Sequence, residues 1–247
     1  MVESRSTDRP LASRTRLHFT GSASSRPHPA QAASTARPHL NDHGTFDIFA
    51  AGKSIGTEQF EIRARSNQIQ AQANVQLRVE QDGKTVEIRT SSNLLLDPLL
   101  EPLSYAWDQK AEKVSQLSID FRARPAHARY KTVNGQDDQR DFQLPKDVVV
   151  LDDNALHQYQ LALARYDLQK NGAQIFHAFI PQEALPGVIT LSLVGPESVT
   201  LEGDQRTLRR FLLTADQAQI SLWVDEEGRL QMVSVPAAQY QAVRRKR

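Results

Sequence analysis

Residues 69–80 alternate strictly between apolar and polar side chains, which is incompatible with a helix there. The apolar positions are Ile69, Ala71, Ala73, Val75, Leu77 and Val79, and every residue between them is Gln, Asn, Arg or Glu. A period of two is that of a β-strand with one buried and one solvated face. Asp82-Gly83 follows, and Val86 and Ile88 then resume the alternation. This predicts a tight hairpin, because glycine readily adopts the positive φ of such turns.

The same alternation recurs later in the chain. The segments are 117–123, 189–193 and 220–224, with a further apolar run at 230–235. Asn134-Gly135 and the run from Asp225 to Gly228 provide turn signals between strands. Short connections between amphipathic strands favour an antiparallel meander with one covered face. Residues 44–247 are therefore predicted to form a single antiparallel β-rich domain.

One segment has a helical period instead. Its apolar positions are Leu156, Tyr159, Leu163 and Tyr166. The spacing of three, four and three residues predicts a helix. Asp152-Asp153-Asn154 precedes it with residue types that cap helices, and Asn171-Gly172 offers a left-handed cap at its end. A single helix in a long meander packs most simply against the concave side of a curved sheet. The predicted fold is therefore mainly β, a half-barrel with one main helix on its concave face.

The first 43 residues differ in composition from the rest of the chain. They contain seven Ser, six Arg and four Pro but only three acidic residues, and no periodic apolar pattern. Such a segment cannot bury enough apolar surface to offset the entropy of ordering, so we expect a disordered tail that folding does not need. Its Arg- and Ser-rich composition and Ala30-Gln31-Ala32 also resemble a targeting remnant, although residues 16–29 lack the apolar stretch of a secretory signal.

Composition and motifs exclude several classes of protein. The chain has no cysteine, which rules out disulfides, thiolate metal sites and cysteine nucleophiles. The formal net charge of +1 argues against a nucleic-acid partner, and no apolar run approaches the roughly 18 residues of a membrane-spanning helix. The seven histidines show no metal-binding spacing, and the G-x-S-x-G motif of serine hydrolases is absent. We therefore expect no metal, no cofactor and no catalytic residue.

Two charged features have simple interpretations. His157 lies at the predicted helix start near Asp152 and Asp153, where a carboxylate contact is conceivable, but we interpret it as a surface or partly buried histidine. The chain ends on Arg244-Arg245-Lys246-Arg247, and residues 44–243 before it carry a net negative charge. We interpret this basic run as a solvated chain end.

The stretch from Leu94 to Trp107 is unusually apolar for a connection. It contains six leucines, a tyrosine and a tryptophan. Pro98 and Pro102 lie within it and are expected to prevent regular strand pairing. An apolar loop of this kind must be covered, either by the helix of the same domain or by a ligand or partner.

Trp223 raises the same question of what covers it. It points to the opposite side of its strand from Leu222 and Val224, so one of the two sides leaves apolar area to be buried. We expect the helix, the leucine-rich stretch or a bound apolar molecule to cover it. The candidate ligand-binding residues are Leu99, Leu100, Leu103, Tyr105, Trp107, Tyr159 and Trp223.

Short motifs at both ends of the domain resemble a known group of proteins. The motifs are Gly44–Phe49 with Gly52–Gly56 at the start, and Gly195–Val199, Arg209-Arg210, Leu222–Asp225 and Gly228–Leu230 at the end. Together they resemble a group of uncharacterised bacterial exported β-rich proteins, which is similar to lipoprotein-carrier half-barrels. The resemblance implies a periplasmic or otherwise extracytoplasmic setting and a sheet wrapped around a helix, with acyl chains held in the cavity. It assigns no catalytic residue.

Three functional hypotheses of different classes follow. The first is a non-enzymatic binding or carrier protein for an apolar, lipid-like ligand in the concavity of the sheet. The second is a structural or assembly protein of the cell envelope that acts through protein–protein contacts. An enzyme comes third, because no catalytic constellation is recognisable. An open apolar cavity would favour the first hypothesis, and a cavity filled by side chains would count against it.

Overall fold

The computed structural model describes residues 40–81, 83–110, 114–131, 137–216 and 218–246, and in this part of the chain it contains one sheet of 15 strands. The strands are β1 (Asp42–Ala50), β2 (Lys53–Ala64), β3 (Ile69–Gln81), β4 (Lys84–Leu96), β5 (Pro102–Lys110), β6 (Val114–Asp120), β7 (Ala126–Lys131), β8 (Asp137–Phe142), β9 (Val149–Val150), β10 (Gln174–Ile180), β11 (Leu185–Leu201), β12 (Asp204–Ala215), β13 (Ala218–Val224), β14 (Leu230–Val235) and β15 (Tyr240–Arg244). The described residues also form α1 (His157–Ala164) and the 3-10 turn η1 (Pro236–Ala238). None of the described helices is long and apolar enough to cross a membrane.

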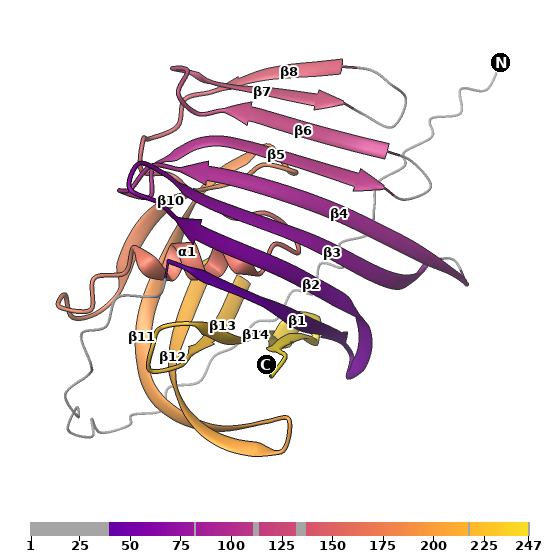
Figure 1. The fold of residues 1–247 in the computed structure, drawn as a ribbon, viewed down its shortest axis with the longest axis vertical. Coiled ribbons are helices and arrows are strands. Elements are labelled where there is room, and N and C mark those ends of the chain that lie inside the picture. The colour runs from indigo at the N-terminus through magenta and orange to yellow at the C-terminus, as the bar shows by residue number, and fades with distance from the viewer. Residues whose placement is uncertain (1–39, 82, 111–113, 132–136, 217, 247) are drawn as a thin grey trace. The chain divides into compact units, whose positions relative to one another are not determined.

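The strand order shows how the chain builds this sheet (Figure 1). β1 lies in the middle, and successive strands extend from it in one direction as far as β8. The chain then crosses to the opposite edge, where β9 pairs with β10 in parallel, and it returns strand by strand to β15, which pairs with β1. The other neighbouring pairs are antiparallel. Because the two end strands, β8 and β9, do not pair with each other, the sheet is an open half-barrel, and the predicted fold class is confirmed.

The hairpins confirm the period-two prediction. Residues 69–81 form β3, and Gln81 lies opposite Lys84 across a turn that contains Gly83, whose φ is +73°. β13 and β14 flank the predicted turn at Asp225–Gly228, where the Gly228 N–H donates to the Asp225 carbonyl at 3.0 Å. The predicted turn at Asn134-Gly135 lies outside the described residues.

The sheet has two faces with different roles. The core face carries the inward residues of β3, such as Ala71 and Val75, which belong to the main hydrophobic core. We call the opposite face the outer face. α1 lies inside the curve of the sheet (Figure 1), where it packs against β2, β3, β9 and β14. Its buried residues are His157, Gln158, Gln160, Leu161, Ala162 and Leu163. The predicted helix on the concave face is therefore present, and it is buried on most of its sides.

α1 is shorter than the apolar spacing predicted. It ends at Ala164 instead of near Asn171-Gly172. After it, the side chain of Gln174 donates to the Asp167 carbonyl at 2.7 Å and accepts the Asp167 N–H at 2.9 Å. These side-chain bonds to the backbone compete with continued helical bonding. The start of the helix also differs, because the N-cap position is Leu156, without a side-chain cap of its own, and not a residue of 152–154.

The leucine-rich stretch is not an irregular loop, so this prediction was wrong. β4 runs through Leu96 and β5 begins at Pro102, which leaves only residues 97–101 as a connection. The Asp97 carboxylate holds this turn, since its Oδ1 accepts the N–H groups of Leu99 and Glu101, both at 2.8 Å. A proline at the first residue of a strand leaves the ladder intact, and a register shift between Leu95 and Leu96 adjusts the pairing.

The two ends of the described chain meet in the middle of the sheet. β1 begins at Asp42, two residues before the predicted start of the domain, and β15 ends at Arg244. Two nitrogens of the Arg244 guanidinium donate to the Asp42 carboxylate at 2.6 and 2.7 Å, and both side chains are buried. Residues 1–39, which hold most of the predicted tail, lie outside the described residues.

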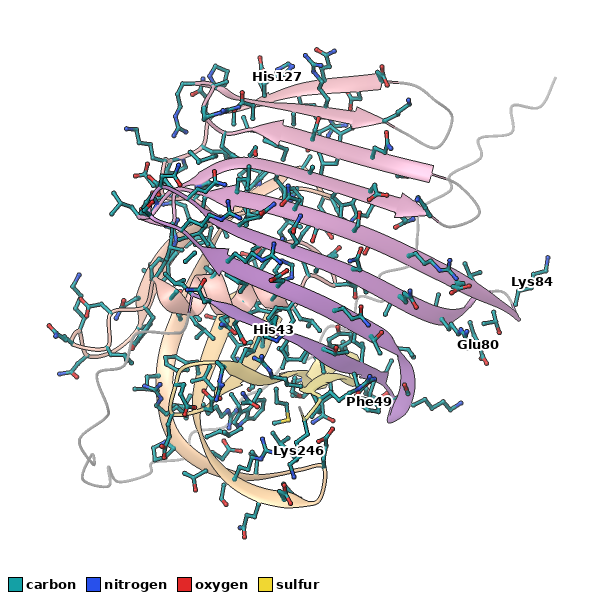
Figure 2. The ribbon with its side chains drawn as sticks, in the orientation of Figure 1. His43, Phe49, Glu80, Lys84, His127 and Lys246 are labelled. Carbon is teal, nitrogen blue, oxygen red and sulfur yellow. The ribbon has the colours of Figure 1, made fainter. Side chains whose placement is uncertain are left out.

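The basic C-terminus is solvated in part: Arg245 and Lys246 are exposed, as predicted, but Arg244 is buried. Besides the buried Arg244, Arg245 forms an ion pair with Asp47. Lys246 forms one with Asp204, which places it beside the β11–β12 hairpin (Figure 2). Acidic residues of β1 and β12 are specific partners for these cations, which a count of net charge cannot show.

A small second core lies on the outer face. Its buried members are Leu201, Leu208, Trp223 and Met232. The long β11–β12 hairpin curls at its end (Figure 1), and the residues near that end cover the tryptophan. Trp223 therefore points away from Leu222 and Val224, as alternation predicted, but its cover is this hairpin and not α1, the leucine-rich stretch or a ligand. The Arg210 guanidinium lies over its ring at 5.4 Å from the centroid.

Side chains connect the two open edges of the sheet. The rings of Phe142 in β8 and Phe179 in β10 lie 4.8 Å apart. The Tyr130 hydroxyl, from β7, donates to the carbonyl of Pro181, just beyond β10, at 3.1 Å. The half-barrel is thus bridged by side-chain contacts at a place where the strands themselves do not pair.

Candidate functional site

Glu58 lies at an inward position of β2, where alternation would place an apolar residue. Its cross-strand partners on the same face are Phe46 and Val75, and its side chain is fully buried. Oε2 accepts the Leu156 N–H at 2.6 Å, and Oε1 accepts the His157 N–H at 2.9 Å. Since the first N–H groups of a helix have no partner within it, this carboxylate caps α1 from another part of the chain.

His157 completes the contact between α1 and β2. Its Nδ1 lies 2.7 Å from Glu58 Oε1, and because a carboxylate only accepts hydrogen bonds, Nδ1 bears the proton. The ring stacks on Phe60 at a centroid distance of 6.2 Å, and Nε2 has no partner among the described residues. The residue is fully buried, so the prediction of a surface or partly buried histidine was wrong. Its carboxylate partner comes from a strand 99 residues away, which local sequence could not indicate.

A second buried acid lies at the start of the same segment. The Tyr105 hydroxyl donates to Asp152 Oδ2 at 2.5 Å, and the Gln182 N–H donates to Oδ1 at 3.2 Å. The Asp152 N–H donates to Gln158 Oε1 at 2.6 Å, which ties the segment to α1. Burial raises the pKa of Asp152 to about 6, because the hydrogen bonds from Tyr105 and Gln182 offset the loss of hydration only in part.

The raised pKa of Asp152 predicts a pH-dependent stability. Folding raises this pKa, so the contribution of Asp152 is present below about pH 4 and is lost as the pH rises through about 6. Asp152→Asn should therefore reduce the fall in unfolding free energy between pH 4 and pH 7.5 by about 2 kcal/mol. Urea unfolding at both pH values measures it. The control is Asp137→Asn, an exposed carboxylate without an ion pair to another described residue, and an unchanged pH dependence in Asp152→Asn would contradict the assignment.

Glu58, His157 and Asp152 form a buried polar layer between α1 and the sheet, and its role is structural. Glu58, His157 and Asp152 are all shielded from solvent, so a substrate cannot reach them without displacing α1. In the part of the chain that the structure describes, no group of three or more His, Cys, Asp or Glu residues could hold a metal ion. The layer fixes α1 to the sheet.

The residues predicted to bind a ligand do not form one site. Leu100 and Tyr105 are buried in the main core, and Trp107 and Tyr159 pack against it half-buried. Leu103 is half-buried, Leu99 is 77% exposed, and Trp223 lies in the second core on the other face. A cavity beside α1 that Leu163 and Phe211 help to line measures about 10 Å³, which is no more than a single water needs.

A much larger hollow lies on the outer face across β3–β8. This outer trough has a volume of about 690 Å³. Its outward side chains form two rows of cross-strand neighbours. The first row is Gln72, Asn93, Ala106, Ser118, Arg129 and Gln139, and the second is Asn74, Ser91, Asp108, Gln116, Lys131 and Asp137. Short side chains at Ala106 and Ser118 lie between longer ones on both sides, which produces the hollow.

The outward side chains of the trough are mostly polar and carry two cations and two carboxylates, and Trp107 also contributes to its lining. Three of its side chains have partners, since Ser91 donates to Asp108, and Asn93 accepts from Gln70 at 3.0 Å. The remaining polar side chains form no hydrogen bond or ion pair with another described side chain: Gln72, Asn74, Gln116, Ser118, Arg129, Lys131, Asp137 and Gln139. The trough therefore offers both hydrogen-bond donors and hydrogen-bond acceptors to a ligand. Arg129 and Lys131 are matched in number by Asp108 and Asp137, and Lys131 lies opposite Asp137.

Comparison with known proteins places the fold. The sequence matches no protein-family model and no curated protein. Among solved structures, it is similar to a beta-barrel-like protein of the domain of unknown function DUF1849 from Brucella abortus, with a TM-score of 0.57, 8% identity, and coverage of 85% of this chain and 96% of that one. The likeness is one of fold.

A second structural match is weaker. It is a DUF1089 family protein from Pseudomonas aeruginosa, with a TM-score of 0.46, 14% identity, and coverage of 73% of this chain and 90% of that one. The DUF1849 match agrees with the expected resemblance to uncharacterised β-rich proteins. Neither description names a lipoprotein carrier or an exported protein, so those parts of the resemblance stay predictions.

Proposed function

We propose that this chain is a non-enzymatic binding protein whose ligand occupies the outer trough. The trough itself is the observation that supports the proposal. Its volume of about 690 Å³ falls within the range of known ligand sites, about 300–1,000 Å³. It lies on a rigid sheet, which holds its side chains in fixed register and so lowers the entropy lost on binding.

The core face offers less room for a ligand. α1 and the main core fill it, and an acyl chain there would have to displace α1 together with its bonds to Glu58. Carriage of an apolar, lipid-like ligand on this face stays a prediction, and the filled core counts against it. A structural role in the cell envelope through protein–protein contacts stays the alternative.

The absence of catalysis and the extracytoplasmic setting are also part of the proposal. The acid and imidazole that lie closest together in the core, Glu58 and His157, are enclosed and act on α1, which supports a binding role over an enzymatic one. The extracytoplasmic setting rests on the sequence resemblance alone.

Filling the trough tests the proposal. In the double variant Ala106→Trp/Ser118→Trp, two indole side chains would occupy the floor, while Gln219→Trp adds the same group at an exposed position of β13 as a control. Calorimetric titration with palmitate, a soluble peptide and an oligosaccharide measures binding by each variant, and circular dichroism checks the fold. We expect at least one probe to bind the wild type and the control, and to lose about tenfold or more in affinity for the filled variant. Binding of no probe, or equal binding to the filled variant, would overturn the proposal.

A further inference from the structure

The geometry of the outer trough points to a ligand class: a hydroxyl-rich oligosaccharide that bears a carboxylate, with the carboxylate held by Arg129. This inference rests on the proposed function and adds the chemistry of the ligand to it. Three properties of the trough support it, namely the kind of hydrogen-bonding groups, the placement of charge, and the position on a sheet face.

The hydrogen-bonding groups of the trough require a ligand that both donates and accepts. Gln72, Asn74, Gln116 and Gln139 present amides, each with one acceptor oxygen and two donor hydrogens, and Ser118 adds a hydroxyl with both functions. A ligand that only accepts, such as a sulfate ion, would leave the amide oxygens without partners. An acyl chain would remove all these groups from water without replacing their bonds, which is unfavourable. Sugar hydroxyls donate and accept at every ring, so they match this lining.

The charges of the trough place one anionic group of the ligand. Arg129 is the charged member of the first row, between Ser118 on β6 and Gln139 on β8, and it has no ion pair among the described residues. In the second row, Lys131 lies opposite Asp137, so a carboxylate there would meet a competing acid. Arginine binds a carboxylate through two parallel N–H···O bonds, which gives Arg129 the geometry for this group.

The position of the trough argues against other polymers. An extended peptide is typically bound at a sheet edge through its main chain, but the trough lies on a face whose backbone groups already pair within the sheet. A nucleic acid requires an excess of positive charge, and here Arg129 and Lys131 are offset by Asp108 and Asp137. The trough crosses from β3 to β8, which is about 24 Å at the usual strand spacing and suits a chain of several sugar rings.

A matched pair of ligands tests the role of Arg129. Tetragalacturonate carries carboxylates, and its methyl ester has the same sugar chain without charge. We expect the acid to bind about tenfold or more tightly than the ester in calorimetric titration. Arg129→Gln should abolish this difference while changing the affinity for the ester by less than about threefold. Arg122→Gln, an exposed arginine that pairs with Asp120 outside the trough, serves as the control and should bind both ligands as the wild type does.

The outcomes separate this inference from the proposed function. Equal binding of acid and ester, or an undiminished preference in Arg129→Gln, overturns the assignment of Arg129. If neither saccharide binds but the filled variant Ala106→Trp/Ser118→Trp loses another probe, the ligand class is wrong and the trough remains a binding site. If the saccharides bind the filled variant as well as the wild type, both the inference and the proposed function are wrong.

Discussion

Glu58→Ala is expected to lower the free energy of unfolding by about 3–5 kcal/mol, because each buried donor that loses its acceptor costs about 1–3 kcal/mol. The variant would leave three donors without an acceptor: the N–H groups of Leu156 and His157, and the His157 Nδ1. Each buried donor left unpaired is costly, and the N-terminus of α1 would also lose its cap. Urea unfolding of the full chain measures the effect, and faster amide exchange in α1 would locate it.

The same strand supplies a matched control. Glu61 lies three residues further along β2, is partly exposed and pairs with Arg63 on the surface. Glu61→Ala should change the stability by less than about 1 kcal/mol. Glu58→Gln keeps the shape and one acceptor oxygen, so it should fall between the two. A Glu58→Ala variant as stable as Glu61→Ala would show that the carboxylate does not hold α1 on the sheet.

Arg244→Ala is expected to destabilise the protein by about 3–5 kcal/mol as well. It would remove the guanidinium from the buried Asp42 carboxylate, together with the bond from Arg244 to the His43 carbonyl at 2.7 Å. The arginine also covers the Phe60 ring, at 5.2 Å from its centroid, so apolar packing is lost with the charge. Denaturant unfolding measures the loss, and the neighbouring Arg245→Ala, which removes a surface pair with Asp47, should cost less than about 1 kcal/mol.

A double-mutant cycle separates the ion pair from the packing. Burial alone would raise the pKa of Asp42, but the hydrogen bonds and charge of Arg244 lower it overall. The stability that this pair contributes is therefore present above about pH 4 and is lost as the pH falls through the lowered value. Asp42→Asn in the Arg244→Met background should recover part of the loss, because no unpaired charge remains buried. Full additivity of the two substitutions would contradict the pairing.

Local patterns predicted most of the strands but few of their partners. Alternation identified β3 and β13, and it placed Trp223 on the opposite face from Leu222, because period two is a property of each strand alone. It could not show that the β11–β12 hairpin curls over Trp223, since that contact depends on the bend of a distant element. The half-barrel with its internal helix followed from the same patterns together with the short connections.

The sequence contains one sign of the buried polar layer. Glu58 interrupts the inward series Phe60 and Ile62 of β2, and a charged residue at a core position needs a buried partner. The identity of that partner is a tertiary property, because His157 lies 99 residues away. The outer trough could not be predicted from the sequence either. Its hollow requires Ala106 and Ser118 to be cross-strand neighbours, and that depends on which strands pair.

The strand order has a consequence for how the molecule acquires its structure. The last strand of the described chain fills the gap in the middle of the sheet, beside the first, so Phe46 must find Arg244 across almost two hundred residues of chain. During synthesis, β1 to β8 emerge as a meander whose first strand still exposes an unpaired edge. Contacts of such sequence separation slow folding, and an exposed edge invites wrong pairing in the interval. The central seam between β1 and β15 is therefore where a newly made chain is most exposed to misassembly, although in the finished protein it is among the best protected.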